Sequence, residues 1–429
     1  MSLICKPYYF RILVSELGLG ENESATYEVL NNSENDLVQM QKRFLNAVAP
    51  NLPCKSNTLP FLYAIPKLHK SPVKFRFSVS QKECPLKSLN QTLTKILKLV
   101  YLQHKKWCNS IYNYTGINYM WVADNFNDVL QKIDKINART KGVSTKQFDF
   151  STLYTSLPKD FLIEKLNWCL EKAFIGGKKQ FISVYSNEAK FVNSPQDSTL
   201  HFSLTKIKNI LKCVIKHSFL KLGNKTFNQI NGIAMGWDPA PFAANLALYS
   251  CEHIFQANLI KQNYSAAKQN NNNCRYIDDI NTLNNQVFED QIHLIYPQEI
   301  ICNRENANSD LCGHFLEIDI NIKSEKFQTK IYDKRNDFNF PIVKFPDTKS
   351  NIPNRVVFNV YISQLLRFLR VCSEIDDFKT ESKMLISCFL LKGCNRQLLV
   401  KKTIQTLKKH SKTFNKFNIS PTEFSNQIF

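Results

Sequence analysis

Two short apolar segments of this chain carry acidic residues where a strand is expected to be buried. The first is Gln147-Phe148-Asp149-Phe150, a strand interrupted by one acid, and the second is Arg275 to Asn281, a hairpin with Asp278 and Asp279 at its bend. A buried carboxylate costs free energy unless another group pairs with it. The acids lie 129 residues apart (149 to 278), so they meet only if neighbouring strands come from distant parts of the chain.

The chain is basic as a whole. Its 429 residues include 56 Lys plus Arg against 36 Asp plus Glu, for a formal net charge of +20. Such a chain attracts polyanions, nucleic acid first and an anionic membrane surface second. Because 43% of the residues are hydrophobic, the chain can bury a large core, which argues against a disordered or fibrous protein; its length indicates two or three lobes.

The cysteines and the N-terminus indicate a reduced, soluble, intracellular protein. The thirteen cysteines form no Cys-x-x-Cys pair and no Cys/His array of zinc spacing, and their odd number argues against a closed set of disulfides. Residues 1–20 mix Lys6, Arg11 and Glu16 with apolar residues, which is typical of neither a signal peptide nor a membrane span. Four lysines near the C-terminus favour a solvated or phosphate-binding face, with a nuclear signal as the alternative: Lys408, Lys409, Lys412 and Lys416.

Hydrophobic periodicity predicts alternating helices and strands. Basic and apolar residues alternate between prolines from Leu62 to Val79, a pattern typical of strands with cations on one face. We expect a hairpin turn at Gly223-Asn224 and a loop tip at the Asn run 270–273. Helices are predicted around four apolar stripes: from Leu93 to Val100, from Phe126 to Ile133 behind Asp124 as N-cap, from Leu162 to Leu170, and from Ile207 to Ile215. A further Ala/Leu-rich helix is expected from Phe242 to Phe255.

The three acids suit a particular chemistry if they converge. Phosphoryl transfer from a nucleoside triphosphate uses two divalent ions about 3.5 to 4 Å apart, one at the primer 3′-oxygen and one at the leaving pyrophosphate. Hard cations such as Mg²⁺ prefer carboxylate oxygens. Asp149, Asp278 and Asp279 are therefore candidate metal ligands, although the pair at 278–279 taken alone is more often a solvated turn.

The order of several segments resembles the reverse transcriptase family. Phe148 to Pro158 looks like its first catalytic motif, Gly232 to Pro241 like the second, Tyr276-Ile277-Asp278-Asp279 like the tyrosine-x-Asp-Asp signature, and Phe315 to Ile318 like the primer grip. Ile65 to Lys70, Phe75 to Phe77 and Lys330 to Phe340 are more similar to Penelope-like retroelement enzymes and related reverse transcriptase domains of animal genomes. The resemblance covers about residues 62 to 394.

The resemblance implies a role for each matching residue. Asp149, Asp278 and Asp279 would be the catalytic acids and would bind two Mg²⁺ ions, with Mn²⁺ as a substitute. Tyr154 would close the space beneath the sugar 2′ position and so select deoxynucleotides; the alternative is a core tyrosine. The nucleotide-binding set would comprise Lys74, Arg76, Thr152, Leu153, Tyr154, Met235 and Gly236, with Lys67 or Lys70 as alternatives to Lys74.

Some positions depart from the family's pattern. Ala234 stands where Pro is usual, Trp237 where a small hydroxyl residue is usual, and Asn281 follows the acidic pair where an apolar residue is usual. Asn245 and Glu317 each replace an Asp. No lysine is evident as general acid for pyrophosphate, for which Arg304 and Lys330 are weak candidates.

The predicted fold is an α+β right-hand polymerase. We expect an accessory region at 1–58, fingers at 59–145 and 160–228, a palm at 146–159 and 229–322, and a basic helical thumb at 323–429. The thumb would bind the duplex backbone through Arg367, Arg370, Lys401 and Lys402, or would be a solvated helical domain.

Three functional hypotheses follow. The preferred one is an RNA-directed DNA polymerase whose partners are an RNA template, a DNA primer and deoxynucleoside triphosphates, without a membrane. The second keeps the fold as a nucleic-acid binding module of weakened catalysis. The three intact acids argue against it, and the irregular Trp237 region argues for it. The third is a polymerase that uses ribonucleotides, and Tyr154 separates it from the first.

Overall fold

The computed structural model describes the whole chain except residues 1–3, 20–23, 25, 69, 71, 175–179, 195–199, 339 and 341. His69 and Asn339, which belong to the segments that resemble Penelope-like enzymes, therefore lie outside the described residues. The chain forms two compact units. The first comprises 1–122, 149–271 and 287–303, and the second comprises 123–148, 272–286 and 304–429.

The first unit contains a five-stranded sheet with the strand order β1-β9-β8-β2-β3. Its strands are β1 (Tyr27–Leu30), β2 (Phe61–Lys67), β3 (Lys74–Ser80), β8 (Ser218–Leu222) and β9 (Lys225–Gln229). β2 and β3 form the expected antiparallel pair, and β8 and β9 turn at Gly223-Asn224 as predicted. Because β1 pairs with β9, the region predicted as accessory contributes a strand to this sheet.

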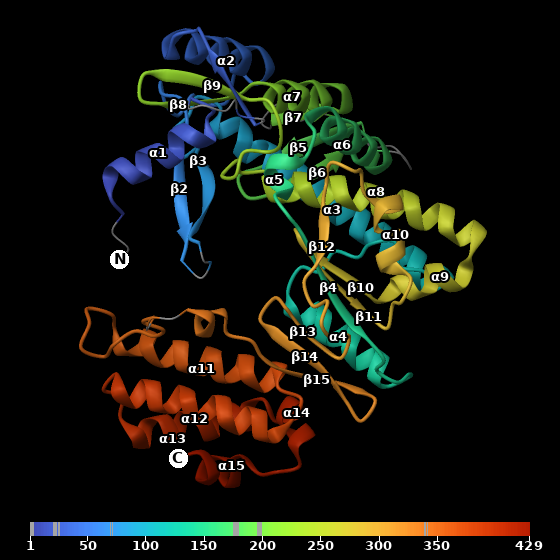
Figure 1. Ribbon diagram of the computed structural model, residues 1–429, viewed down its shortest axis with the longest axis vertical. Coiled ribbons are helices and arrows are strands. Elements are labelled where there is room, and N and C mark those ends of the chain that lie inside the picture. Colours follow the sequence, from blue (N-terminus) through green and yellow to red (C-terminus); the bar gives the residue numbers. More distant parts are fainter. Residues whose placement is uncertain are drawn as a thin grey trace. The chain divides into compact units, whose positions relative to one another are not determined.

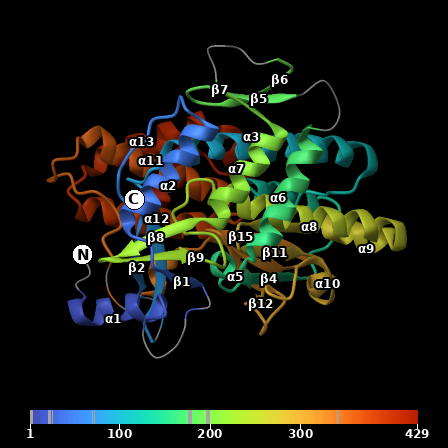
Figure 2. The same cartoon turned by 90° about the horizontal axis from the view of Figure 1, so that it is seen from above.

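Helices make up most of the rest of the first unit (Figure 1). They are α1 (Lys6–Glu16), α2 (Glu34–Val48), α3 (Lys87–Thr115), α5 (Leu153–Ser156), α6 (Lys159–Phe174), α7 (Leu204–Lys216), α8 (Ala240–Gln262), α9 (Tyr264–Gln269), α10 (Phe288–Ile295) and the 3₁₀ turn η1 (Asn270–Asn272). A small separate sheet projects beside α3 and α7 (Figure 2), with β5 (Phe181–Val184) between β6 (Ala189–Val192) and β7 (Leu200–Ser203).

The second unit is built on two sheets. One has the order β10-β11-β4-β12, from β4 (Thr145–Phe150), β10 (Asn273–Tyr276), β11 (Asp279–Leu283) and β12 (Cys302–Arg304), although residues 149–150 and 302–303 of these strands belong to the first unit. The other is the antiparallel sheet of β13 (Cys312–Phe315), β14 (Ile318–Lys323) and β15 (Lys326–Ile331).

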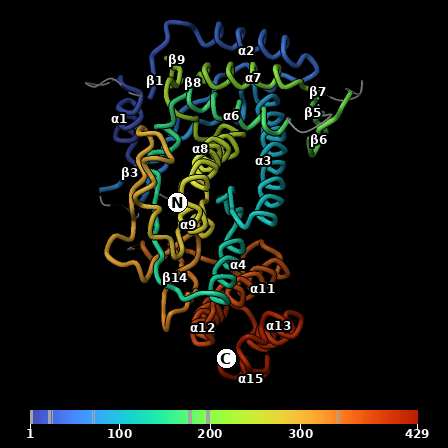
Figure 3. Tube along the Cα trace, turned by 90° about the vertical axis from the view of Figure 1, so that its right-hand side faces the viewer, coloured from blue at the N-terminus to red at the C-terminus, as the bar shows by residue number. Residues whose placement is uncertain are grey.

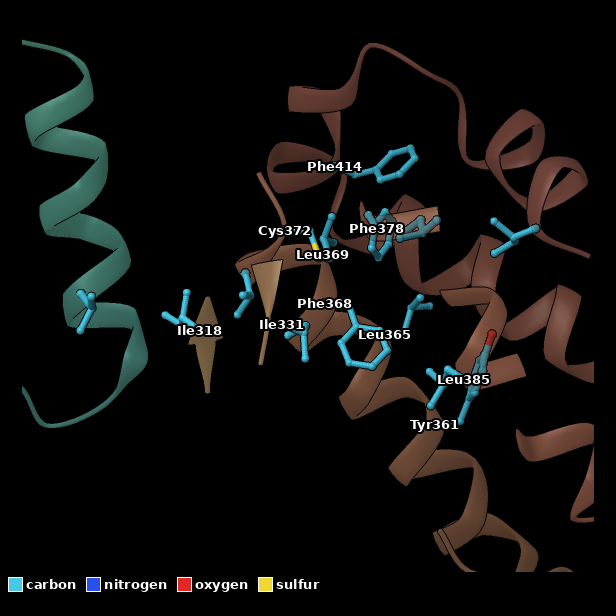
Figure 4. Packing of buried hydrophobic residues seen from close by; sticks show 14 of the residues in the cluster. Ile318, Ile331, Tyr361, Leu365, Phe368, Leu369, Cys372, Phe378, Leu385 and Phe414 are labelled. Atoms are coloured by element: carbon cyan, nitrogen blue, oxygen red, sulfur yellow. The ribbon is translucent and has the colours of Figure 1, made fainter. Parts of the chain in front are cut away.

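The C-terminal part of the second unit is helical. Its elements are η2 (Lys334–Asp337), α11 (Asn354–Val371), α12 (Ile375–Leu391), α13 (Arg396–Lys409), α14 (Ser411–Phe414), η3 (Asn415–Phe417) and α15 (Pro421–Ile428). One apolar core joins these helices, β14, β15 and α4 (Phe126–Asn137), and Figure 4 shows Tyr361, Leu365 and Phe368 of α11 within it beside Phe378 and Leu385 of α12. Burial of such side chains stabilises by roughly 1.5 to 3 kcal/mol each.

Several local expectations need correction. The N-cap of α4 is Asn125, which accepts from the Asn127 amide, and not Asp124. The Asn run is no loop tip, because Asn270 and Asn273 are fully buried, and the Asn270 amide donates to Gln256. Buried polar side chains are usually hydrogen-bonded, and composition alone does not reveal which asparagines will find such partners.

The thirteen cysteines are all free thiols, as expected, and many are buried. None of the described helices is both long enough and apolar enough to cross a lipid bilayer.

Candidate active site

The hairpin of β10 and β11 presents two adjacent acids at its bend. Tyr276 pairs with Asp279, so Ile277 and Asp278 are the two turn residues. Ile277 has φ 56°, an unfavourable conformation for a β-branched residue. The fully buried Arg275 donates from Nη1 to the Ile277 carbonyl oxygen at 3.1 Å and so supports the turn. A strained turn held by a buried side chain is a common feature of functional sites.

Asp149 lies on the strand next to this hairpin in the sheet order. β4 neighbours β11, and Asp149 is its fifth residue, between the buried rings of Phe148 and Phe150. On the other side of β4 lies β12, where burial and then the charge of Asp149 raise the pKa of the Cys302 thiol to about 12. Asp278 and Asp279 belong to the second unit and Asp149 to the first.

Asn281 fastens β11 to β4 within the second unit. Its Nδ2 donates to Thr145 Oγ1 at 2.9 Å, and Gln147 Nε2 donates to the same oxygen at 2.9 Å. All three side chains are buried. Asn281, two residues after Asp279, therefore has a structural role that an apolar residue could not fill. The sequence did not reveal this role.

The turn after Asp149 packs against the Gly232 segment within the first unit. Thr152 has φ 60° and directly precedes α5, which carries Leu153 and Tyr154. The Ile233 amide donates to the Tyr154 carbonyl oxygen at 2.6 Å. A Cβ at Gly232 would lie 2.2 Å from that oxygen, so only glycine fits here.

The next residues of this segment contact the end of β3. The Val79 amide donates to the Met235 carbonyl oxygen at 2.6 Å. Gly236 has φ 112°, and a Cβ there would lie 2.2 Å from the Val79 carbonyl oxygen. The structure therefore brings together Tyr154, Met235, Gly236 and the β3 strand that carries Lys74 and Arg76.

The irregular Trp237-Asp238 pair is used for packing against α3. Trp237 is buried, and its Nε1 donates to Asn90 Oδ1 at 3.0 Å. Asp238 forms an ion pair with Lys87 at 2.7 Å. These contacts attach the segment to α3, so the departure at Trp237 does not by itself indicate weakened catalysis.

The β2–β3 hairpin gathers cations on one face. Lys67 lies directly opposite Lys74, and Ile65 lies opposite Arg76. Lys74 and Arg76 are exposed, whereas Lys67 is half-buried. Lys74 and Arg76, two residues apart on one strand, present their cations on the same face of the sheet.

The predicted nucleic-acid-binding residues of the thumb differ in exposure and in whether their side chains already form ion pairs. Arg367 forms an ion pair with Glu317 at 3.0 Å, so its guanidinium is engaged with the residue of the primer-grip-like turn. Arg370 and Lys401 are exposed and Lys402 is half-buried. Both weak candidates for the general acid are also engaged, Arg304 with Asp310 and Lys330 with Asp319.

No ready-made metal centre is present in the part of the chain that the structure describes. Among these residues, no three His, Cys, Asp or Glu side chains are gathered closely enough to hold an ion. Mg²⁺, however, is usually bound by one or two carboxylates with substrate phosphates and water, and not by a protein cage. The adjacent carboxylates of Asp278 and Asp279 at the hairpin bend are of the type that this mode of binding uses.

Comparison with solved structures identifies the type of fold. No protein-family model and no curated protein matches the chain. The solved telomerase from Candida albicans, in complex with a TWJ fragment of telomeric RNA, superposes with a TM-score of 0.59 at 14% identity, over 98% of this chain and 66% of that one. The fold is that of a right-hand polymerase.

Two other solved structures are more distant. Apo telomerase from Candida tropicalis gives a TM-score of 0.47 at 12% identity, over 100% of this chain and 77% of that one. The RNA-dependent RNA polymerase of BmCPV at its elongation state gives 0.40 at 10% identity, over 82% and 28%. The chain spans about two thirds of the Candida albicans telomerase chain, at 66%.

The α+β polymerase fold expected from the sequence is therefore confirmed. The similarity to reverse transcriptases is confirmed at the level of fold. The finer resemblance to Penelope-like enzymes, the metal ions and the boundaries of fingers, palm and thumb stay predictions.

Proposed function

We propose that this chain is an RNA-directed DNA polymerase that extends a primer with deoxynucleotides. One observation carries the proposal: in a polymerase fold, the strand that bears Asp149 is the neighbour of the hairpin that bears Asp278 and Asp279. In the proposed reaction the primer 3′-oxygen attacks the α-phosphorus of the nucleotide, and pyrophosphate leaves.

Asp149 and Asp278, with Asp279 beside them, would hold the Mg²⁺ ions. Bound there, the ions would supply activation of the 3′-oxygen and neutralisation of the leaving pyrophosphate. Their oxygen ligands would be carboxylates completed by substrate phosphates, because the described residues offer no larger ligand set. Mn²⁺ would substitute for Mg²⁺.

The nucleotide would lie between the β2–β3 hairpin and the packed Tyr154 and Met235 segments. Lys74 and Arg76 would bind triphosphate oxygens, with Arg76 as the bidentate donor. Thr152 and Leu153 hold the turn that presents Tyr154, whose ring would exclude a 2′-hydroxyl. Gly236 would let the backbone approach the templating base pair.

RNA is the proposed template. The similar telomerase of Candida albicans was solved with RNA, and the formal charge of +20 suits a nucleic acid duplex. Arg370, Lys401 and Lys402 would contact the duplex backbone without reading its sequence.

A primer-extension assay tests the proposal. Purified protein is given a DNA primer annealed to an RNA template, with Mg²⁺ or Mn²⁺ and either dNTPs or rNTPs. We expect extension with dNTPs, its loss in Asp278→Asn, and added use of rNTPs in Tyr154→Ala. The matched control is Asp376→Asn, an acid of α12 whose side chain is 90% exposed, which should extend normally.

A second candidate is a nucleic-acid binding module without catalysis. The observation in its favour is that no three metal-ligating side chains are gathered in the described residues. Tight duplex binding without extension under either metal would favour this candidate over the polymerase.

A further inference from the structure

Helix α3 has an unusual composition for a long surface helix. Its 29 residues include five lysines and neither aspartate nor glutamate. Exposed helix faces normally mix both signs of charge, because pairs three or four residues apart stabilise the helix. A helix without acids forgoes that stabilisation and concentrates positive charge.

Lys87 and Lys95 hold neighbouring segments of the first unit. Lys87 pairs with Asp238, and Lys95 donates to the carbonyl oxygens of Tyr185 and Ser186 at 3.0 and 2.7 Å. These contacts belong to the N-terminal half of the helix, where it supports the Trp237 segment and the small β5–β6 sheet.

The remaining lysines lie further along the helix on its outer side. Lys98 and Lys106 are exposed, and within the described part of the chain neither forms an ion pair. Lys105 lies beside them and is half-buried. Lys98, Leu102 and Lys106 follow at four-residue spacing, so they share one stripe of the helix.

The acids of the neighbouring elements do not neutralise this stripe. α3 packs against α6 and α8 and against β5 and β6 (Figure 3). Each acid that these elements or their connecting turn present at the surface has a lysine partner of its own: Asp160 with Lys216, Glu164 with Lys165, Glu171 with Lys208, and Glu188 with Lys190. Glu252 of α8 is buried and accepts from Tyr296.

Exposed aromatic rings border the lysine stripe in the last turns of α3: Tyr112 follows Lys98 and Lys105 at seven-residue spacing, and Trp107 and Tyr114 lie about 80 to 100° around the helix from Lys106. Trp107 is 41% exposed although its ring stacks on His253 at 5.1 Å, so the indole is held in place with part of it in solvent. Tyr112 and Tyr114 follow, the latter 93% exposed. Tyr264 of α9 donates to the Thr115 carbonyl oxygen and adds a fourth exposed ring at the helix end.

We propose that this surface, the α3 platform of Lys98, Lys105, Lys106, Trp107, Tyr112, Tyr114 and Tyr264, binds single-stranded nucleic acid outside the polymerase site. Lysines that follow a phosphate backbone, beside rings on which bases stack, are the elements by which proteins hold single strands without reading sequence. A protein partner fits less well, because lysine is depleted from protein interfaces. A solvated face accounts for the lysines but not for four exposed rings beside them.

The α3 platform shares no residue with the proposed polymerase site. From Asn90, which bonds Trp237, to Lys106 the helix advances about 24 Å at 1.5 Å per residue. The inference does not depend on the proposed polymerase activity, since none of its residues belongs to the catalytic or nucleotide-binding set. A strand held here would be a part of the copied RNA away from the primer, or a displaced strand.

Fluorescence anisotropy with a labelled single strand of about 10 nucleotides tests the proposal, within the 4 to 16 that such sites span. RNA and DNA versions are compared, each with excess annealed primer–template present to occupy the polymerase site. The variants are Lys98→Ala/Lys106→Ala and Tyr114→Ala. The matched control is Lys141→Ala/Lys349→Ala, which removes two exposed lysines of the second unit, neither of which lies on an element that packs against α3.

The double lysine variant should weaken binding by about tenfold or more and reduce the slope of log Kd against log salt by roughly 0.7 for each phosphate that the protein no longer neutralises. Tyr114→Ala should weaken binding of the single strand at least about fivefold, as expected when one base no longer stacks on a ring. Because the Tyr114 side chain is 93% exposed, its removal should leave the fold intact, so misfolding would not explain the loss. The control should bind as the parent protein does. Equal weakening in the control, unchanged binding in both variants, or competition by polyglutamate as strong as by unlabelled RNA would each overturn the proposal.

Primer extension by the same variants keeps the two proposals apart. We expect unchanged extension of a short primer–template by Tyr114→Ala, because the α3 platform lies outside the polymerase site. A protein that binds the single strand but never extends a primer would refute the polymerase and leave the platform standing.

Discussion

Replacing Gly232 by alanine tests the packing between the two segments that carry the nucleotide-binding residues. Gly232 has φ +77°, and a Cβ there would lie 2.2 Å from the Tyr154 carbonyl oxygen and 2.6 Å from the Thr155 Cα. Both neighbours are backbone atoms, so neither moves aside by a rotamer change. The turn that presents Tyr154 has to shift.

The expected cost has two parts. A left-handed conformation costs an alanine roughly 1 to 2 kcal/mol, and forcing extra volume into a packed site costs roughly 1 to 3 kcal/mol more. Gly232→Ala should therefore destabilise the first unit by about 2 to 5 kcal/mol. Gly223→Ala is the matched control, because it has φ +59° in the β8–β9 turn but nothing within 4 Å of the new Cβ. It should cost only the backbone part.

Tryptophan fluorescence during urea unfolding measures the difference, because all four tryptophans lie in the first unit: Trp107, Trp121, Trp168 and Trp237. We expect a clearly larger loss of unfolding free energy in Gly232→Ala than in Gly223→Ala. Primer extension should fall in the first variant and persist in the second, because only the first displaces Tyr154. Equal unfolding curves together with normal extension by Gly232→Ala would refute the described packing.

Three further predictions concern single side chains. Burial lowers the pKa of His253 from 6.5 to about 4, with smaller effects from His104 and Lys172. As pH falls, the unfolded chain therefore binds a proton at His253 before the folded chain does. The first unit should lose about 3 kcal/mol of unfolding free energy between pH 6.5 and 4. His253→Phe should flatten this dependence of stability on pH, and an unchanged dependence would contradict the assignment. Asn281→Leu should lower kcat for primer extension about tenfold or more and leave the dNTP KM unchanged, because it removes the bond to Thr145 that fixes β4 beside the catalytic hairpin; an unchanged kcat would be evidence against this positioning role. Arg76→Ala should raise the dNTP KM about tenfold or more, whereas Lys82→Ala, an exposed lysine just past β3, should not, and equal effects would argue against a specific triphosphate contact.

The sequence predicted the elements that follow a simple periodicity. The cationic β2–β3 hairpin, the turn at Gly223-Asn224, the helix after Pro158 and the hairpin around Asp278 all appear where their patterns placed them. These elements depend on local residue types, which is why one sequence suffices to find them.

The contacts that hold the site together were not predictable in the same way. The Gly232 segment depends on a close approach to Tyr154, and Asn281 on a partner 136 positions earlier, Thr145 (145 to 281). Trp237 looked like an irregularity until its bond to Asn90 explained it. Such pairings arise from tertiary packing between distant segments, about which local composition carries no signal.

The predictions for Asp124 and for the Asn run were wrong for a related reason. Both assignments relied on the residue type that usually occupies such a position, namely a cap for Asp124 and a loop for the asparagines. The structure uses the next residue, Asn125, as the cap and buries Asn270 in a hydrogen-bond network. Local preference was overridden by tertiary contacts.

Metal binding measured in a double-substitution cycle tests the central claim most directly. Mn²⁺ is titrated by calorimetry or electron paramagnetic resonance into the protein with primer–template and a non-reacting dNTP analogue, for the parent, Asp149→Asn, Asp278→Asn and the double variant. If the two carboxylates bind the same ions, each single substitution should abolish most of the binding and the double should lose no more than either single. Independent and additive losses, or undiminished Mn²⁺ binding in Asp149→Asn, would contradict a shared metal site.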